Sequence, residues 1–281
     1  MRIDEVIAPS ILGDALASLK RFPDSVLYAG GTAFFQGDLE SPAHSPATVL
    51  SLHSISELKS INRTDRYIEV GAMTPLSDLL ALKEGFIPGA LRDTIRNIGN
   101  FAVRNLATLG GNLSCRDRFR DCFPVLACME ALAEFRQASS SRWVNLNRLV
   151  DDHGLPAIPK GEILTRVRIP LMEWNIGVVQ KFDASRAYSE RRALFVFLAR
   201  LDKRAISDFK IFYTHDNALR DRAAETALMG KKIPLSSRDI DATLGAYESL
   251  CARTELDRIQ SVRFLSLVRK ALSLLNEGTG S

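Results

Sequence analysis

The segment Ala107-Thr108-Leu109-Gly110-Gly111-Asn112 places two adjacent glycines between an apolar segment and a predicted helix. Because glycine has no Cβ, another molecule can approach the backbone closely at such a point. A second turn of small residues, Ala29-Gly30-Gly31-Thr32-Ala33, occurs earlier in the chain, directly after a short apolar run. We expect the two turns to meet in the fold and to hold one phosphate-bearing cofactor between them.

Phosphate binding would account for the hydroxyl and amide side chains beside the glycines. Consecutive backbone N–H groups in a tight turn can point together at small anionic oxygens when no Cβ intervenes. Thr32 and Thr108 add hydroxyl donors, and Asn112 adds an amide. Neither glycine pair has the G-x-G-x-x-G spacing of a Rossmann turn or the lysine of a P-loop, so each pair alone also fits a tight turn without a ligand. If a phosphate lies there, a bulky residue at Gly110 or Gly111 should abolish binding and leave most of the fold intact.

The composition is that of a soluble globular protein with two or three compact units. The chain has 281 residues, of which 46% are hydrophobic and 25% charged, and both fractions are ordinary for a globular fold. No apolar run approaches the ~20 residues of a membrane span, and the N-terminus lacks the apolar segment of a signal peptide. The net charge of +4 is spread along the chain, without the concentrated basic face that nucleic acid requires. We therefore expect a cytoplasmic protein that binds neither membrane nor nucleic acid.

The sequence shows no set of side chains typical of metal binding or of acid–base catalysis. Cys115, Cys122 and Cys128 follow the spacing C-x6-C-x5-C, which differs from zinc patterns with closely paired ligands. Buried thiols are the expected state, and a set of cluster ligands is the alternative. The four histidines lie outside the two turns, and no nucleophile–base pair is visible. We expect no catalytic side chain and no metal site, as when a bound cofactor carries the chemistry.

Hydrophobic periodicity predicts a mixture of helices and strands in the first part of the chain. Apolar residues at helical spacing indicate a helix from Leu12 to Leu19, and Thr74-Pro75 is typical of a helix start capped by threonine. Residues 163–169 alternate cleanly, which predicts a strand with its arginines on the outer face. The other expected strands are 26–29, 48–52, 67–72 and 143–146, and the other expected helices cover 91–98 and 122–132.

A domain boundary is expected at Pro170, which ends the alternating strand. Beyond it, three segments at 178–182, 193–201 and 209–213 could form an antiparallel sheet, and helices follow at 221–229, 237–251 and 262–275. The fold class is therefore α+β. The first domain covers residues 1–170 in two lobes of about 1–58 and 59–170, and a C-terminal α+β domain covers 171–281.

The segment from Ile95 to Asn112 resembles one family closely. This family is the FAD-binding medium subunit, or FAD domain, of the molybdenum hydroxylases, of the xanthine dehydrogenase and carbon monoxide dehydrogenase type. It has an apolar helix, a glycine, an Ile/Val-Arg-Asn step and a Thr-Ile-Gly-Gly-Asn turn at this place, and Leu27 to Thr32 is similar to its other pyrophosphate loop. Further landmarks follow in the family's order over nearly the whole chain: Ile68 to Ala72 with Thr74, Glu162 to Leu164 ending at Ile169-Pro170, Lys181-Phe182 with Arg186, and Glu225 to Lys231.

The resemblance implies a function as well as a fold. It implies a two-lobed FAD-binding domain of the molybdopterin dehydrogenase type, followed by a C-terminal domain of the carbon monoxide dehydrogenase flavoprotein type. The family's FAD domain takes electrons from iron–sulfur clusters and passes them to NAD or another acceptor. The implied partners are a molybdenum-cofactor large subunit, which hydroxylates the substrate, and an iron–sulfur small subunit. Because neither turn contains a histidine or cysteine, we expect the FAD to be bound non-covalently.

The resemblance also assigns cofactor contacts by position. Ile98 lies where some relatives have an aromatic residue near the flavin ring, Asp121 matches an acidic contact, Leu164 an apolar contact, and Lys181 a lysine near the cofactor. Without the resemblance, Asp121 would be a helix cap, Leu164 a core residue and Lys181 a strand lysine. Arg104 would be structural, pairing with a carboxylate or a helix end. The residues expected to line the FAD at the two turns are Leu27, Tyr28, Ala29, Gly30, Gly31, Thr32, Ala33 and Phe34, and Thr108, Leu109, Gly110, Gly111 and Asn112.

The segment after Asn112 departs from the family pattern, because Arg116, Asp117, Arg118 and Arg120 stand where small or apolar residues are usual. It is either a solvated loop with weak local ion pairs or a site of altered acceptor or partner recognition, since arginine binds phosphates and acidic patches. Two other functions therefore stay open. One is a stand-alone two-lobed FAD oxidoreductase, and the other is a flavin-free scaffold or assembly protein that keeps the fold.

Overall fold

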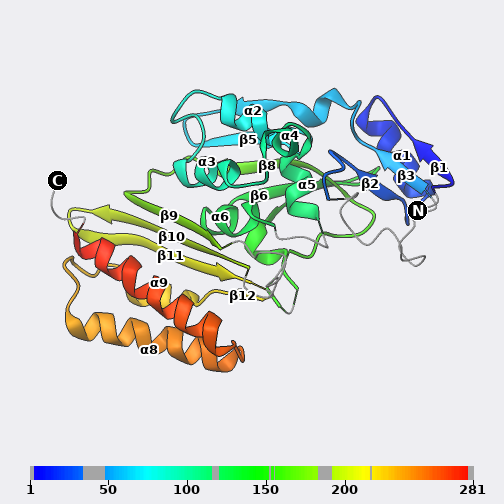
Figure 1. The fold of residues 1–281 in the computed structure, drawn as a ribbon. Helices are drawn as coiled ribbons and strands as arrows, with labels where there is room; N and C mark the ends of the chain where they lie inside the picture. The colour runs from blue at the N-terminus through cyan, green and yellow to red at the C-terminus, as the bar shows by residue number, and fades with distance from the viewer. Residues whose placement is uncertain are drawn as a thin grey trace. The chain divides into compact units, whose positions relative to one another are not determined.

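The computed structural model describes residues 3–33, 48–115, 120–151, 153–154, 156–182, 192–215 and 217–277. The chain forms two compact units (Figure 1). The first consists of Met1–Asp151 and Pro156–Leu171, and the second of Asp152–Leu155 and Met172–Ser281. In the described ranges, no helix is long and apolar enough to cross a membrane, and no group of three or more His, Cys, Asp or Glu side chains is placed to hold a metal ion.

A three-stranded parallel sheet with one helix begins the first unit. The strands β1 (Glu5–Ile7), β3 (Thr48–Ser51) and β2 (Val26–Tyr28) lie in that order, and α1 (Leu12–Arg21) follows β1 in the chain. The helix buries Leu12, Ala15 and Leu19 in a core that includes Leu50 of the central strand. The helix and strands predicted here are confirmed, and the first glycine turn directly follows β2.

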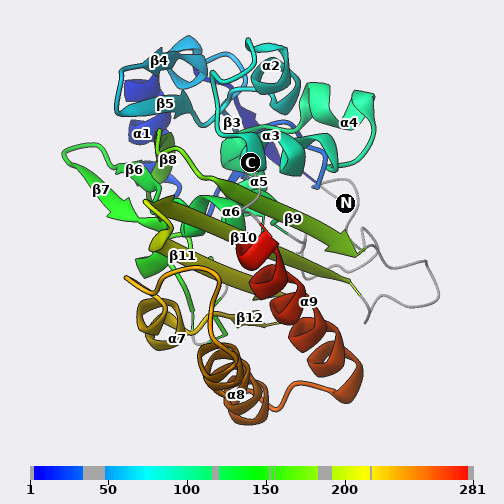
Figure 2. The same cartoon turned by 90° about the vertical axis from the view of Figure 1, so that its left-hand side faces the viewer.

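A five-stranded antiparallel sheet forms the second part of this unit. Its order is β4 (Ile61–Arg63), β5 (Tyr67–Gly71), β8 (Ile163–Pro170), β6 (Leu132–Arg136) and β7 (Ser141–Asn145). Figures 1 and 2 both show helices α3, α5 and α6 beside β8 and β6. The bounds of the helical segments are η2 (Ser56–Lys59), α2 (Leu76–Ala81), α3 (Gly89–Arg96), α4 (Phe101–Leu106), α5 (Leu109–Ser114), α6 (Cys122–Cys128) and η3 (Leu146–Arg148).

An ion-pair ladder runs across one face of this sheet, which confirms the prediction that the arginines of β8 lie on the outer face. Arg166 donates to Glu134 at 2.8 Å and to Glu69 at 3.4 Å, and Arg168 donates to Glu69 at 2.6 Å. Glu134 is almost fully buried, with 3% of its side chain exposed. Its carboxylate also accepts a hydrogen bond of 2.6 Å from the Thr165 hydroxyl, so the ladder ties β5, β8 and β6 together.

The ladder predicts a loss of stability in acid. Burial alone raises the pKa of Glu134, but hydrogen bonds from Thr165 and Arg166 and the charges of Arg166 and Arg136 outweigh burial, so the pKa lies below 4.5. A carboxyl whose pKa is lowered on folding stabilises the protein above its unfolded pKa, and this contribution is lost as pH falls through the folded pKa. We expect Glu134→Gln to lower the free energy of unfolding by roughly 3 kcal/mol at pH 7, and by less below pH ~4. Urea unfolding at both pH values measures this.

Asp93 provides an exposed control, because it pairs with Arg96 and both side chains are more than half exposed, at 59% and 62%. Exposed pairs contribute about 0–1 kcal/mol, so Asp93→Asn should change the free energy of unfolding little at either pH. A difference between wild type and Glu134→Gln that stays constant from pH 7 to acid would contradict the role given to the Glu134 carboxylate.

The second unit is a four-stranded antiparallel sheet with helices on one side (Figure 2). The strands are β12 (Ala218–Leu219), β11 (Ala205–Thr214), β10 (Ala193–Asp202) and β9 (Ile176–Phe182), and the helices are α7 (Arg222–Ala227), α8 (Ser237–Arg253) and α9 (Arg258–Glu277). The core between sheet and helices includes Phe195, Phe197, Phe209, Tyr213 and Phe264. The predicted sheet and three helices are confirmed, and the short β12 is an addition.

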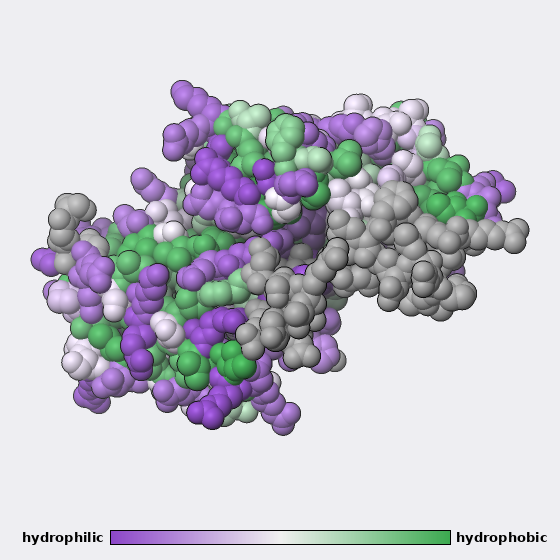
Figure 3. All heavy atoms as spheres, in the orientation of Figure 1, coloured by the Kyte–Doolittle hydropathy of each residue, from purple (hydrophilic) through white to green (hydrophobic). Residues whose placement is uncertain are grey.

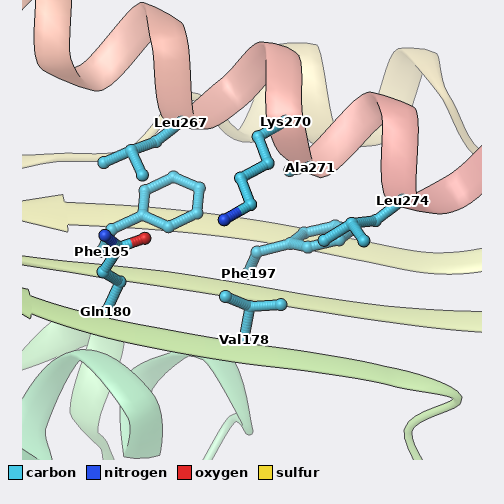
Figure 4. Close-up of a pocket in the computed structure, with 8 residues that line it drawn as sticks. All are labelled: Val178, Gln180, Phe195, Phe197, Leu267, Lys270, Ala271 and Leu274. Atoms are coloured by element: carbon cyan, nitrogen blue, oxygen red, sulfur yellow. The ribbon is translucent and has the colours of Figure 1, made fainter.

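A small cavity lies between α9 and the sheet in this unit. Figure 4 shows Phe195 and Phe197 pointing from β10 toward α9, with Lys270 reaching down between them. The cavity volume is about 10 Å³, which is no more than the space that one water molecule needs. This part of the second unit is therefore packed core and offers no room for a cofactor.

Three local predictions in the first unit are wrong. The helix α2 begins at Leu76 without a side-chain cap, and the Thr74 hydroxyl instead donates to the carbonyl of Lys59 at 3.5 Å. The helix predicted over 122–132 ends at Cys128, because Glu130 adopts a left-handed φ of 57° and the chain continues into β6. The second glycine pair, predicted to form a tight turn, lies within the helix α5.

Candidate functional site

The second glycine pair lies inside the first turn of α5 and is not an open loop. Thr108 is the N-cap, and its Oγ1 accepts a hydrogen bond of 3.0 Å from the N–H of Gly111. The N–H of Asn112 donates to the carbonyl of Thr108 at 2.9 Å. Threonine is a favoured cap because its side chain satisfies an N–H that has no partner within the helix.

The other N–H groups of this turn are bound to the end of β5. Gly110 donates to the carbonyl of Ala72 at 2.8 Å, and Leu109 donates to the carbonyl of Thr74 at 3.1 Å. All four N–H groups from Leu109 to Asn112 are thus engaged within the chain. The prediction that the backbone N–H groups of this turn point at a phosphate is therefore wrong, and the Thr108 hydroxyl and Asn112 amide are its remaining donors.

Close packing explains why the first residue of this pair is glycine. A Cβ at Gly110 would lie 2.6 Å from the Cβ and 2.8 Å from the carbonyl oxygen of Ala72. At Gly111 the nearest atoms would be the Oγ1 of Thr108 at 2.9 Å and the Cβ of Ala29 at 3.6 Å. A glycine is thus required at position 110 because Ala72 of the same chain leaves no room for a Cβ. Gly111 instead lies where the second turn borders the first.

The two turns meet, as predicted. A Cβ at Gly30 would fall on the carbonyl oxygen of Leu106 and would lie 2.5 Å from the carbonyl carbon. Leu106 is the last residue of α4, directly before the second turn. Together with the approach of Ala29 to Gly111, this contact brings the backbones of both turns side by side.

The first turn has the free donors that the second turn lacks. Gly31 has a left-handed φ of 72°, and the ring of Tyr28 folds back over it, with its Cζ atom 2.8 Å from the place of a Cβ. In the part of the chain that the structure describes, the N–H groups of Gly30, Gly31 and Thr32 make no hydrogen bond. Successive free N–H groups around a left-handed residue form a concavity that binds anions.

Asn112 joins the second turn to the helix that follows. Its Oδ1 accepts a hydrogen bond of 3.0 Å from the N–H of Cys122, at the start of α6. Asp121 stands at the N-cap position but makes no capping hydrogen bond with its side chain. The alternative that Asp121 serves as the helix cap therefore fails, and Asn112 brings the 5% exposed Asp121 next to the second turn.

Comparison with known families agrees with this geometry. A family model described as the FAD binding domain in molybdopterin dehydrogenase matches residues 2–172. The chain belongs to this family. The two meeting turns thus lie in the FAD-binding domain of an oxidoreductase family.

The chain covers very different shares of the length of its relatives. The chain is 27% identical over 226 residues to the glyceraldehyde dehydrogenase medium chain of Sulfolobus acidocaldarius, with 79% of each chain covered. It is 29% identical over 179 residues to aldehyde oxidase 2 of Cavia porcellus, covering 58% of this chain but 13% of the oxidase.

Solved structures show the same fold over both units. A chain of carbon monoxide dehydrogenase from Hydrogenophaga pseudoflava superposes with a TM-score of 0.83 at 21% identity and covers 99% of this chain and 98% of that chain. This match confirms the predicted fold, an FAD-binding domain of this type followed by a C-terminal α+β domain.

The FAD-binding domain also positions two predicted flavin contacts. Ile98 is 7% exposed, and its carbonyl accepts a hydrogen bond of 3.0 Å from Arg104, which confirms the helix-end alternative for Arg104. Leu164 is 5% exposed on β8. Its neighbour Thr165 accepts a hydrogen bond of 2.9 Å from the N–H of Ala72, the residue that holds Gly110.

Some predicted residues are not part of this arrangement. Phe34 and residues 116–119 lie outside the described residues. Lys181 lies on β9 of the second unit, so its contact with the cofactor stays a prediction. Arg120 donates to the carbonyls of Cys115 and, at 2.9 Å, Pro156. This agrees with a structural role for that arginine of the departing segment.

Sequence reasoning missed the residues that support the turns. Leu106, Ala72 and Thr74 contribute only their backbone carbonyls or Cβ to the contacts described above. Backbone groups carry no signal of their own in a sequence. Only the glycines opposite Leu106 and Ala72 indicated these contacts in the sequence. A glycine indicates that another group packs closely against the backbone, but it does not show which residue that group belongs to.

Proposed function

We propose that this chain is the FAD-binding electron-transfer subunit of a molybdenum hydroxylase, passing electrons from iron–sulfur clusters of a partner through FAD to NAD or another acceptor. The meeting of the two glycine turns carries this proposal, because it joins free N–H donors, a hydroxyl and an amide at one place in an FAD-binding domain. The first turn supplies the N–H groups of Gly30, Gly31 and Thr32, which make no hydrogen bond with any residue that the structure describes. Bound non-covalently, FAD would supply the redox chemistry, and the chain supplies placement and electrostatics.

The two turns take different parts in the proposed site. The first turn binds the pyrophosphate through its backbone, with Leu27, Tyr28, Ala29 and Ala33 beside it. Phe34, which lies outside the described residues, is assigned by the resemblance alone. At the second turn, Thr108 and Asn112 donate from their side chains. Leu109 and Gly110 are fully enclosed by the chain and shape the turn from behind, so that Gly111 is its closest approach to the cofactor.

The remaining predicted contacts complete the proposed site. Ile98 and Leu164 pack against apolar parts of the FAD, and Asp121 accepts a hydrogen bond from it. The family resemblance alone assigns Lys181 as a further contact. In this proposal residues 1–170 are the FAD-binding domain, with lobes of about 1–58 and 59–170, and residues 171–281 are the C-terminal domain.

The proposed partners are a molybdenum-cofactor large subunit and an iron–sulfur small subunit. Support comes from the relatives: the Sulfolobus protein is named a medium chain, which implies other chains beside it. In this proposal, electrons enter the FAD from the iron–sulfur clusters of the small subunit. We propose that the assembled complex works in the cytoplasm.

Purified full-length chain is expected to be yellow and to release about one FAD per chain on denaturation. Absorbance of the supernatant after heat or acid precipitation measures this release and distinguishes FAD from a covalent flavin. A colourless chain that also fails to bind added FAD would contradict the proposal and favour a flavin-free scaffold.

Co-purification separates an electron-transfer subunit from a stand-alone flavoenzyme. A tagged chain expressed in its own cell should bring along one molybdenum-containing chain and one iron–sulfur chain, visible by metal analysis. Addition of NADH to this complex should bleach the flavin absorbance if NAD is the acceptor. A yellow chain that purifies alone and oxidises a substrate without partners would instead favour the stand-alone enzyme.

A further inference from the structure

An arginine closes the sharp bend between α3 and α4. Gly99 makes the bend with a left-handed φ of 51°. The Nη1 atom of Arg104 donates to the carbonyls of Gly99 at 2.7 Å, Ile98 at 3.0 Å and Arg96 at 3.3 Å. The last carbonyls of a helix lack partners within it and carry partial negative charge. Arg104 therefore satisfies the end of α3 from a position on the next helix.

Apolar packing does little to hold α4 in place. None of its residues is buried, and its large apolar side chains Phe101 and Leu106 are 71% and 59% exposed. Figure 3 shows hydrophobic residues at the surface over this helix, near the top of the view. The polar contacts of Arg104 are therefore a main tie between α4 and the helix before it.

The position of α4 fixes the backbone carbonyls that border the proposed cofactor site. Its last carbonyl, on Leu106, is the group against which Gly30 packs without room for a Cβ. The next carbonyl, on Ala107, accepts a hydrogen bond of 2.9 Å from the N–H of Leu76. A shift of α4 would therefore move the surface that supports the first turn and its free N–H groups.

We propose that Arg104 is a positioning residue for the FAD. It holds the carbonyl of Ile98, a proposed flavin contact, and through α4 it holds the carbonyl of Leu106 against Gly30. The guanidinium donates to three carbonyls on the protein and acts on the cofactor only through these groups. This inference rests on the proposed FAD binding at the two turns.

The chain contains a matched control for this role. Arg92 on α3 donates in the same way to three carbonyls at the end of α2, namely Leu80 at 2.8 Å, Leu82 at 2.9 Å and Lys83 at 3.0 Å. Among the described residues, none of these carbonyls accepts a hydrogen bond from either glycine turn, and none lies close to the Cβ position of a glycine in those turns. Loss of Arg92 therefore removes a helix-end clamp of equal chemistry at the C-terminal end of α2, the end opposite Leu76, whose N–H donates to the Ala107 carbonyl.

The test compares Arg104→Met with Arg92→Met in the full chain. Both variants should unfold at lower temperature, because each loses a guanidinium that donates to three backbone carbonyls. Only Arg104→Met should weaken FAD binding, by on the order of tenfold, as expected for loss of a charged hydrogen-bond donor, and shift the visible absorption bands of the bound flavin. Arg104→Lys should recover part of the affinity, since an ammonium can still donate to these carbonyls.

Hydrogen exchange supplies a second readout that needs no FAD. In the cofactor-free chain, the peptide covering residues 26–33 should exchange faster in Arg104→Met than in Arg92→Met. Equal exchange and equal FAD affinity in the two variants would overturn the positioning role. A wild-type chain that binds no FAD would overturn the proposed function, and the exchange comparison would still decide whether Arg104 fixes the first turn. If a Met variant fails to fold, the lysine variants of both positions allow the same comparison.

Discussion

Alanine in place of Gly30 is expected to abolish FAD binding and to lower the free energy of unfolding of the chain by at least about 3 kcal/mol. The added Cβ would fall on the carbonyl oxygen of Leu106 and lie 2.5 Å from its carbonyl carbon. A flexible side chain could move aside, but a backbone carbonyl at a helix end can move only with its helix. The first turn must then leave α4, and the free N–H groups of Gly31 and Thr32 lose their place.

Urea unfolding and an FAD titration of the purified chain measure the two effects. Gly13→Ala is the matched control, because a Cβ at Gly13 on α1 would meet no atom within 4 Å, and alanine is favoured over glycine in a helix by about 0.5–1 kcal/mol. This control should keep full FAD affinity and gain slightly in stability. An alanine variant of Gly30 that binds FAD with wild-type affinity would show that the turns do not meet as described.

The parts of the fold that could be predicted from the sequence are those with a clear hydrophobic periodicity. The strand β8 alternates between buried and less buried residues from Thr165 to Pro170, with Arg166 and Arg168 on the polar face. The helix α9 buries Phe264, Leu267, Val268 and Ala271 at helical spacing. In contrast, α4 buries none of its residues, so it has no apolar stripe by which a helix can be recognised. Its position depends on Arg104 and on the backbone, which periodicity does not report.

The candidate site was predictable in its location but not in its chemistry. The two glycine pairs indicated close approaches, and the family resemblance indicated FAD. The sequence could not tell whether a glycine makes room for a ligand or for the chain itself, because that depends on which backbone lies opposite. At Gly30 and Gly110 it is the carbonyl of Leu106 and the backbone of Ala72, and both are distant in sequence.

The adjacent glycines of the second turn are therefore expected to differ sharply. Gly110→Ala should destabilise the chain by about 2–3 kcal/mol, because the Cβ would lie 2.8 Å from the carbonyl oxygen to which Gly110 donates its own N–H. This corrects the expectation that replacing either glycine leaves most of the fold intact. The amount of FAD that this variant binds should fall only in proportion to the fraction of chain that is unfolded.

Gly111→Ala should show the reverse pattern. Its Cβ meets the movable Oγ1 of Thr108 at 2.9 Å, and the loss of that cap, about 1 kcal/mol, is largely offset by alanine in a helix. The new methyl group points toward the first turn, since its other neighbour is Ala29, so FAD affinity should fall by roughly tenfold or more in a chain of nearly unchanged stability. Urea unfolding without FAD, followed by FAD titration of both variants, separates the effects. Equal losses of stability in the two variants, or full FAD affinity in Gly111→Ala, would mean that the second turn serves only the packing of the chain.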